Sequence, residues 1–390
     1  MAEAGGASDL EGRVARVVSG QIPALDGLRG AAIALVLAHN FNLFEGPEHA
    51  LGKVLRTAMN AGWIGVQLFF VLSGFLITGI LMDTRAKKSG YRAFLARRTL
   101  RIFPLYYLVL LVAFVVLPHV PLPDGLDAGR EHQLYLWLYV SNWVEPYGKS
   151  VALFPHFWSL AVEEQFYLVW PFVVRGLGTK RLAQVSVFLV VAAFVLRIAV
   201  RAETGNVEAA YTWTICRMDA LALGALAAVA MRTPSVIRWL EARRRWLAPA
   251  SIGGLAALFV ATEGFPRTTF LDQSIGYTAS AACFAVGIVS LVLRQARAGE
   301  TAGAPRRSIW ELSPARAIGK YSYGIYVFHL PLHLLVGKPW LAAHAVAASS
   351  LAVGLAYPLV MGAAAFVVAF VSYHVIEAPF LRLKRRFVAT

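Results

Sequence analysis

The sequence predicts an all-α, polytopic membrane protein with about ten transmembrane helices and both termini in the cytoplasm. The first observation is composition: 58% of the 390 residues are hydrophobic and only 15% are charged, with a mean hydropathy of +0.60. A soluble domain usually carries about a quarter charged residues. The second observation is that apolar runs recur along the whole chain. The third is that Lys and Arg alternate between the loops that join these runs.

A membrane-spanning helix needs about 20 apolar residues, and ten runs approach that length. The expected spans are 27–44, 62–82, 102–118, 157–174, 182–200, 211–231, 247–262, 274–293, 318–336 and 346–376. An eleventh run, QLYLWLYVSNW at 133–143, is too short to cross. We expect this run to lie at the membrane surface or to dip into the bilayer.

The basic residues orient the spans. With the N-terminus inside, most of the 37 Lys and Arg residues fall in cytoplasmic segments, including seven between Arg85 and Arg101 and four in 382–386. The outer loops hold few, among them Arg197, Arg201 and Arg267. This bias is the positive-inside pattern. The net charge of +15 is therefore interpreted as orientation signals and phospholipid contacts, and no nucleic-acid partner is expected.

The expected domain organisation is a cytoplasmic N-terminal segment (1–24), one membrane domain (25–378) and a cytoplasmic basic tail (379–390). The first 24 residues lack the apolar core of a cleavable signal peptide. The segment 298–308 is expected to be a flexible inner linker. Cys216 and Cys283 are isolated, so they indicate neither a disulfide framework nor a thiolate metal site.

The run FWSLAVEEQFYLVWP at 157–171 places two acids inside an apolar helix. Ser159, Glu163 and Tyr167 recur every four residues and share one helix face. Glu164 is turned by about 100° from Glu163, so the two cannot line one site equally. Because an intramembrane acid costs free energy, it usually serves function. The alternative is a buried Glu163 that pairs with an Arg for packing alone.

Three other runs hold polar side chains at membrane depth. Arg29 lies near the inner end of the first run, with His39 about 15 Å farther along. His39 is either a proton-handling group or a satisfied core histidine. The ninth run puts Ser322, Tyr326 and His329 on one face, ahead of a kink at Pro331. In the sixth run, Arg217 could pair with an acid on another helix.

The segment RRTLRIFP places Arg98 and Arg101 one helical turn apart, near the cytoplasmic face. Two guanidinium groups in this arrangement form a fork that can hold phosphates. The alternative is an ordinary positive-inside anchor.

Six motifs together resemble the type-3 membrane acyltransferases, a family that O-acylates polysaccharides, lipids and some antibiotics. The motifs are LDGLRG (25–30) with His39, FFVLSGFLIT (69–78), RRTLRIFPLYYL (97–108), FWSLAVEEQFYLVWP (157–171), YSYGIYVFHLP (321–331) and VIEAPFLRLK (375–384). The resemblance covers essentially the whole chain, and the family's ten-span architecture agrees with the count of apolar runs. Some relatives append an extracellular esterase-like domain that has no counterpart in this sequence.

The resemblance implies transfer of an acyl group, most simply acetyl from cytoplasmic acetyl-CoA, to a hydroxyl of a glycan, glycolipid or related acceptor. It implies His39 as general base assisted by Glu163, with Arg29, Arg98 and Arg101 binding the donor. Supporting or substrate-binding roles fall on Ser159, Tyr167, Arg217, Ser322, Tyr326 and His329. The family usually has ten residues between the first-span Arg and His. Here nine intervene, so His39 is turned by about 80° and Asn40 occupies the usual position.

These implications define the functional expectation. The protein is expected in the inner (cytoplasmic) membrane of a bacterium, using acyl-CoA as a substrate, with no permanently bound cofactor and no metal. A proton-coupled transporter is the alternative, because it would also need intramembrane His and Glu. A non-catalytic scaffold would need neither. The sequence leaves the acceptor, the acyl group and the oligomeric state open.

Overall fold

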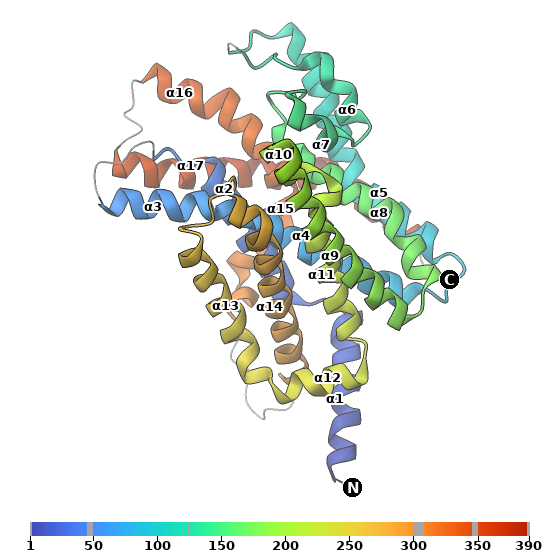
Figure 1. Cartoon of the computed structure of the whole chain (residues 1–390). Helices are drawn as coiled ribbons and strands as arrows, with labels where there is room; N and C mark the ends of the chain where they lie inside the picture. The colour runs from blue at the N-terminus through green and yellow to red at the C-terminus, as the bar shows by residue number, and fades with distance from the viewer. Residues whose placement is uncertain (1, 45–49, 124, 299–307, 345–349, 388–390) are drawn as a thin grey trace.

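The computed structural model describes residues 2–44, 50–123, 125–298, 308–344 and 350–387 (Figure 1). These residues form helices and connecting loops, with no strand among them. The longer α-helices are α1 (Ala2–Ser19), α2 (Pro23–Asn40), α3 (Ala50–Asn60), α4 (Ile64–Thr84), α5 (Gly90–Leu111), α8 (Trp158–Gly176), α9 (Thr179–Thr204), α11 (Thr214–Ala230), α12 (Pro234–Ala242), α13 (Arg244–Ala261), α14 (Tyr277–Arg297), α15 (Ser313–Leu332) and α17 (Leu351–Ser372). The short ones are α6 (Gln133–Trp137), α7 (Ser141–Val144), α10 (Val207–Thr212), α16 (Lys338–Ala343) and α18 (Ala378–Leu383). The predicted all-α class is confirmed, and most of the predicted linker 298–308 lies outside the described residues.

Six helical stretches of the described chain are long and apolar enough to cross a membrane. They are Ala50–Thr84, Gly90–His119, Thr179–Thr204, Val207–Ala230, Asp272–Arg297 and Leu351–Arg386. A seventh is possible if Asp9–Ser19 and Pro23–Asn40, which meet at 51°, form one bent span. A multi-pass helical protein is therefore supported. A helix also lies in each of the ten predicted runs, but the number that cross and the side of the termini stay predictions.

The short aromatic run at 133–143 forms no continuous helix. It divides into α6 and α7, with Tyr139 between them in the left-handed backbone region (φ 54°). Neither helix belongs to a candidate span of the described chain. In Figure 1, α6 and α7 lie with α10 at the top of the view, at one end of the bundle. The run therefore forms no single helix of membrane-spanning length, and its place at the membrane surface stays a prediction.

The centre of the bundle is the packing of α4 on α11. The two backbones approach closely because each helix places a glycine against the backbone of the other. A Cβ on Gly74 would meet the backbone of Leu221, and a Cβ on Gly224 would meet that of Val71. Small residues serve membrane helix packing in this way, since van der Waals contact replaces the hydrophobic driving force.

A second close contact joins α2 to α15. Gly30 faces the backbone of Ala315, and Gly319 faces that of Asp26. This pairing brings the polar residues of α2 beside the polar face of α15. Because α4 also packs on α2, and α8 on α4, the polar side chains of four helices are directed into one interior region.

Candidate active site

The polar face of α8 lines a small central cavity of about 80 Å³. Glu163 Oε1 accepts a hydrogen bond of 2.5 Å from Ser73 Oγ of α4, which itself accepts one of 3.0 Å from the Tyr167 hydroxyl. Glu163 Oε2 lies 3.7 Å from the guanidinium of Arg98. That guanidinium stacks 3.9 Å from the centre of the Tyr167 ring. The predicted face of Glu163 and Tyr167 is thus directed at a serine and an arginine of two other helices.

Residues of the ninth predicted span complete the central cavity. Ser322 and Tyr326 of α15 both line it. The Tyr326 hydroxyl lies 2.6 Å from Ser159 Oγ and donates a bond of 2.9 Å to the backbone oxygen of His156. The structure therefore brings together the predicted elements of α8 and α15.

Glu164 does not line the central cavity. Its Oε1 is buried without a hydrogen bond in the described structure. Its electrostatic partners are Arg98 and Glu163, and it acts in turn on the tyrosines of the α5–α6 region, Tyr106 and Tyr139. The helical-phase argument that separated the two acids agrees with this placement.

A larger cavity of about 610 Å³ adjoins the central one and is strongly basic. We call it the basic cavity. Its charged lining residues are Asp26, Arg29, Arg97, Arg98, Arg101, Lys384 and Arg385. Arg29, Arg98 and Arg101 line the basic and the central cavity alike, so the predicted fork stands at the junction of the two.

A third cavity, of about 350 Å³, lies on the other side of the central one and contains His39; we call it the histidine cavity. It shares Val66 and Tyr326 with the central cavity. The Nδ1 of His39 lies 2.8 Å from the backbone oxygen of Asn60. A carbonyl only accepts, so Nδ1 carries the proton and Nε2 of the neutral ring holds the lone pair.

Asn40 lines the histidine cavity as well, and its side-chain amide donates to the Val36 backbone oxygen at 3.0 Å. Both residues of the displaced Arg–His spacing therefore reach the same cavity. The structure leaves His39 with a base-competent nitrogen, whereas an amide nitrogen has no proton-accepting lone pair at neutral pH.

His39 and Glu163 lie in adjoining cavities and not in one. Tyr326 stands between them as a shared lining residue. His329 lines neither cavity; its Nδ1 lies 2.6 Å from the Tyr326 backbone oxygen and its Nε2 is buried without a hydrogen bond in the described structure. The implied general base His39 and the assisting Glu163 thus line two adjoining cavities, and His329 lines neither.

The rest of the histidine cavity combines aromatic and charged side chains. Trp63, Trp158 and Tyr211 form apolar walls, and Glu145, Glu208 and Arg267 form a charged group. Arg267 binds both carboxylate oxygens of Glu208, at 2.9 and 3.0 Å. Burial and the neighbouring Glu208 raise the pKa of Glu145 to about 7.

Comparison with known proteins identifies the family. The family model described as an acyltransferase domain matches residues 22–374. The chain belongs to this family. The resemblance of the six motifs to the type-3 membrane acyltransferases is thereby confirmed.

Three relatives of this acyltransferase show the range of similarity. The Bacillus subtilis (strain 168) protein YrhL, provisionally named a peptidoglycan O-acetyltransferase, is 28% identical over 334 residues, 80% of this chain and 49% of YrhL. The peptidoglycan O-acetyltransferase OatA of Listeria monocytogenes serovar 1/2a (strain ATCC BAA-679 / EGD-e) is 35% identical over 172 residues, 41% of this chain and 25% of that protein. The O-acetyltransferase OatA of Staphylococcus aureus (strain NCTC 8325 / PS 47) is 25% identical over 332 residues, 81% and 51% of the two chains.

The chain spans about half the length of the Bacillus and Staphylococcus relatives and a quarter of the Listeria one. No solved structure matches the chain. Among the described residues, no group of three His, Cys, Asp or Glu side chains could hold a metal ion.

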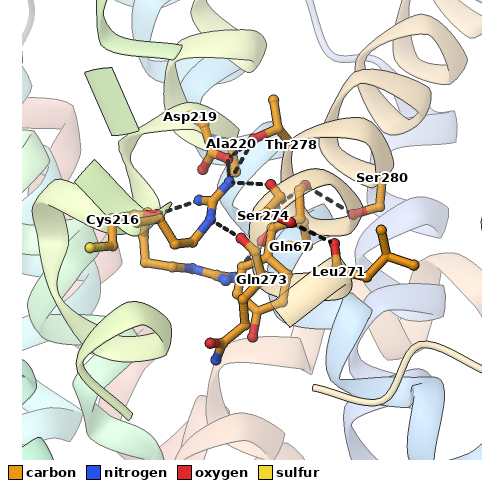
Figure 2. A network of polar contacts seen from close by, with 12 residues as sticks. Gln67, Cys216, Asp219, Ala220, Leu271, Gln273, Ser274, Thr278 and Ser280 are labelled. Carbon is orange, nitrogen blue, oxygen red and sulfur yellow. Dashed lines mark hydrogen bonds and ion pairs between the residues drawn. The ribbon is translucent and has the colours of Figure 1, made fainter. Parts of the chain in front are cut away.

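Arg217 forms no ion pair with an acid among the residues that the structure describes. Its guanidinium donates to Gln67 Oε1 and lies 4.6 Å from the centre of the Tyr277 ring. The acid on the same helix, Asp219, is bound by Arg197 at 2.9 Å and accepts from Thr278 Oγ1 at 2.6 Å (Figure 2). All three charged residues are fully buried, so the cluster joins α9, α11 and α14 and none of its members lines the cavities.

The sequence predicted that Arg197 lies in an outer loop, and this prediction is wrong. Arg197 lies within α9. Its guanidinium also donates hydrogen bonds to the backbone oxygens of Cys216 and Gln273 on other helices. The physical reason is that Asp219 neutralises its charge inside the bundle, which no local pattern around Arg197 reveals.

Several lining residues were missed from the sequence. His156 precedes α8 in a short 3₁₀ turn, and its ring lies 4.7 Å from that of His329. Ser73 is one hydroxyl in an apolar run. Glu145, Glu208 and Arg267 stand in separate connecting segments. The sequence signal for His156 was its position three residues before Ser159. The Tyr326 hydroxyl contacts both residues.

Proposed function

We propose that this chain is an integral-membrane O-acyltransferase that moves an acyl group, most simply acetyl, from acyl-CoA to a hydroxyl of a glycan, glycolipid or related acceptor. The observation that carries the proposal is the row of three cavities. The basic and central cavities share Arg29, Arg98 and Arg101, and the central and histidine cavities share Val66 and Tyr326. A donor at one end and an acceptor at the other would meet through this row.

The basic cavity suits the donor. Coenzyme A carries a pyrophosphate and a further phosphate, and guanidinium groups bind phosphates through parallel hydrogen bonds. The volume of about 610 Å³ is in the range of cofactor sites. From this cavity the pantetheine arm would extend between Arg98 and Arg101 into the narrow central cavity, carrying the thioester toward Tyr326.

The histidine cavity suits a hydroxylated acceptor. Trp63, Trp158 and Tyr211 offer apolar faces on which a sugar ring can lie, and Glu145 and Glu208 offer acceptors for its hydroxyls. The relatives of the acyltransferase that are named for peptidoglycan O-acetylation support a carbohydrate acceptor. The whole activity, its donor and its acceptor remain part of the proposal.

In the proposed step, the lone pair of His39 Nε2 takes the proton of the acceptor hydroxyl as its oxygen attacks the thioester carbonyl. The new carbon–oxygen bond forms, the carbon–sulfur bond breaks, and the proton passes from the histidinium to the coenzyme A thiolate. The Tyr326 hydroxyl, placed between the two cavities, would turn its single proton from the His156 backbone oxygen to the developing oxyanion.

Glu163 would assist this step without touching His39. Its carboxylate holds Ser73 and partly neutralises Arg98, so it fixes the walls through which the thioester must pass. A group that fixes geometry in this way contributes through orientation, because small displacements of reacting atoms are costly.

The alternative, a proton-coupled transporter, would use the same row of cavities. Family membership favours the enzyme, since the matched model describes an acyltransferase domain. The proposal places the protein in the cytoplasmic membrane of a bacterium, with 1–24 and 379–390 as cytoplasmic ends of the 25–378 membrane domain. The acceptor's identity and the oligomeric state are left open.

The experiment that tests the proposal uses the purified protein in lipid vesicles with acetyl-CoA labelled in the acetyl group. Cell-envelope glycans are added, and the label is followed by chromatography and mild alkaline release, which cleaves O-esters. We expect alkali-labile label on a carbohydrate with the wild type and none with His39→Ala. Uptake of label into vesicles without esterification would instead establish a transporter.

A further inference from the structure

The C-terminal tail closes one side of the basic cavity. The helix α18 and the 3₁₀ turn Lys384–Arg386 pack against α5. Arg97 of α5 donates a hydrogen bond of 2.7 Å from its Nε to the backbone oxygen of Phe387. The tail is therefore attached at a defined place and does not simply follow the last helix.

The basic side chains of the tail divide into two pairs. Lys384 and Arg385 line the basic cavity, whereas Arg382 and Arg386 do not; Arg385 is exposed to solvent, as these two are, and Lys384 is half-buried. Arg101, Arg98 and Arg97 repel the Lys384 ammonium, and Glu377 attracts it. A multivalent anion bound among these cations would relieve the repulsion.

The cations of the basic cavity also divide by position. Arg29, Arg98 and Arg101 line the central cavity too, so they stand at the inner junction. Arg97, Lys384 and Arg385 line the basic cavity alone. They line the part of the basic cavity that is not shared with the central cavity, where the acyl group would react.

We propose that Lys384 and Arg385 bind the 3′-phosphate of the donor's adenosine, and that they make the protein selective for coenzyme A over its dephospho form. The inference rests on the proposed function. The thioester must reach the central cavity, so the opposite end of the donor would lie in the part of the basic cavity that the central cavity does not share. The adenosine end carries the 3′-phosphate, a dianion that two cations of the tail can match.

A second cavity near the basic one, of about 460 Å³, fits the donor less well. Its charged lining residues are Asp26, Arg29, Arg101, Arg316, Lys320 and Glu377. Four cations there face two acids, whereas six cations in the basic cavity face only Asp26. Lys384 and Arg385 line the basic cavity, which is the more positive of the two cavities.

The test measures the dissociation constants of coenzyme A and dephospho-coenzyme A by calorimetry on the purified full chain. We expect the wild type to bind coenzyme A at least about 10-fold more tightly, as the loss of a charged phosphate contact implies. Lys384→Ala with Arg385→Ala should bring the ratio of the two dissociation constants close to one, chiefly by weakening the binding of coenzyme A. Lys384→Arg should keep the preference, because it retains the charge.

Two matched controls accompany the test. Arg382→Ala with Arg386→Ala removes the same charge from the exposed side of the same tail and should leave the ratio unchanged. Arg316→Ala with Lys320→Ala removes two cations from the neighbouring cavity and should also leave it unchanged. A ratio that survives loss of Lys384 and Arg385, or that disappears with Arg316 and Lys320, overturns the inference.

The failure of the inference is distinguishable from failure of the proposed function. If the wild type binds both nucleotides equally, the donor stands and the tail assignment is wrong. If a folded wild type, monodisperse by size-exclusion chromatography, binds neither nucleotide, the acyl-CoA donor is wrong and the inference fails with it.

Discussion

Ser73 and Glu163, ninety positions apart in the chain, are joined by a hydrogen bond of 2.5 Å between Ser73 Oγ and Glu163 Oε1. The bond ties α4 to α8 at the wall of the central cavity. The hydroxyl also accepts from Tyr167, so it connects the carboxylate to the ring over which Arg98 is stacked. The position of Arg98 therefore depends on a serine that lines the central cavity but not the basic cavity.

Ser73→Ala should lower kcat about 10-fold with little change in the KM for acyl-CoA, because a hydrogen bond to a charged group contributes about 1.5–3 kcal/mol. Ser186→Ala is the matched control, since Ser186 is fully buried and bonds only to the Leu182 backbone oxygen of its own helix. Steady-state transfer assays check both. Equal effects at the two serines would mean that Ser73 serves packing alone.

His39→Ala should reduce kcat by roughly 100-fold or more while binding of acyl-CoA persists, as expected for the loss of a general base. His39→Gln should be nearly as inactive, because an amide cannot accept the proton. Asn40→Ala should keep most of the activity, since its amide binds the Val36 backbone oxygen. Transfer assays with calorimetry for the donor distinguish these outcomes, and an active His39→Ala beside an inactive Asn40→Ala would move the base elsewhere.

Arg98→Ala and Arg101→Ala should each raise the KM for acyl-CoA by roughly 10-fold or more, by analogy with other charged hydrogen bonds. Lysine at either position should restore binding only in part, because the planar fork is lost. Arg92→Ala is the control, since Arg92 is exposed on the same helix and lines none of the cavities. An unchanged KM in correctly inserted variants would leave both arginines as orientation signals.

The KM for the acceptor should fall roughly two- to fivefold between pH 6 and pH 8, as Glu145 loses its proton. Its pKa is raised to about 7 by burial and by Glu208, with Ser150 and Arg267 opposing. The carboxylate accepts stronger hydrogen bonds from hydroxyls than the neutral acid does. Glu145→Gln should abolish this step in a pH profile of the acceptor KM, whereas His39 should act mainly on kcat. A pH step that persists in the variant would show that Glu145 is not its origin.

Reporter fusions after residues 90, 238 and 303 should be cytoplasmic, and those at 120–130 and 340 should be external. The expectation follows from the alternation of basic residues between loops. Paired phosphatase and fluorescent reporters, which are active on opposite sides of the membrane, measure it. An external fusion at 303 would show that the number of helices that cross before this position differs from the predicted eight.

The sequence by itself determined the features that depend on local periodicity. Composition and run length gave the all-α class, and a repeat of four residues put Glu163 and Tyr167 on one face while turning Glu164 away. The one-turn spacing of Arg98 and Arg101 likewise put both at one cavity junction. These relations follow from the geometry of a single helix, which neighbouring elements hardly change.

Only the tertiary structure decided which faces meet. It separated His39 from Glu163 and placed Tyr326 between them. It paired Asp219 with Arg197 and surrounded Arg217 with aromatic rings. It also placed Lys384 of the tail at the wall of the basic cavity. These contacts join residues far apart in the chain, and they depend on how helices pack through glycines such as Gly74 and Gly224, whose partners no single-helix pattern specifies.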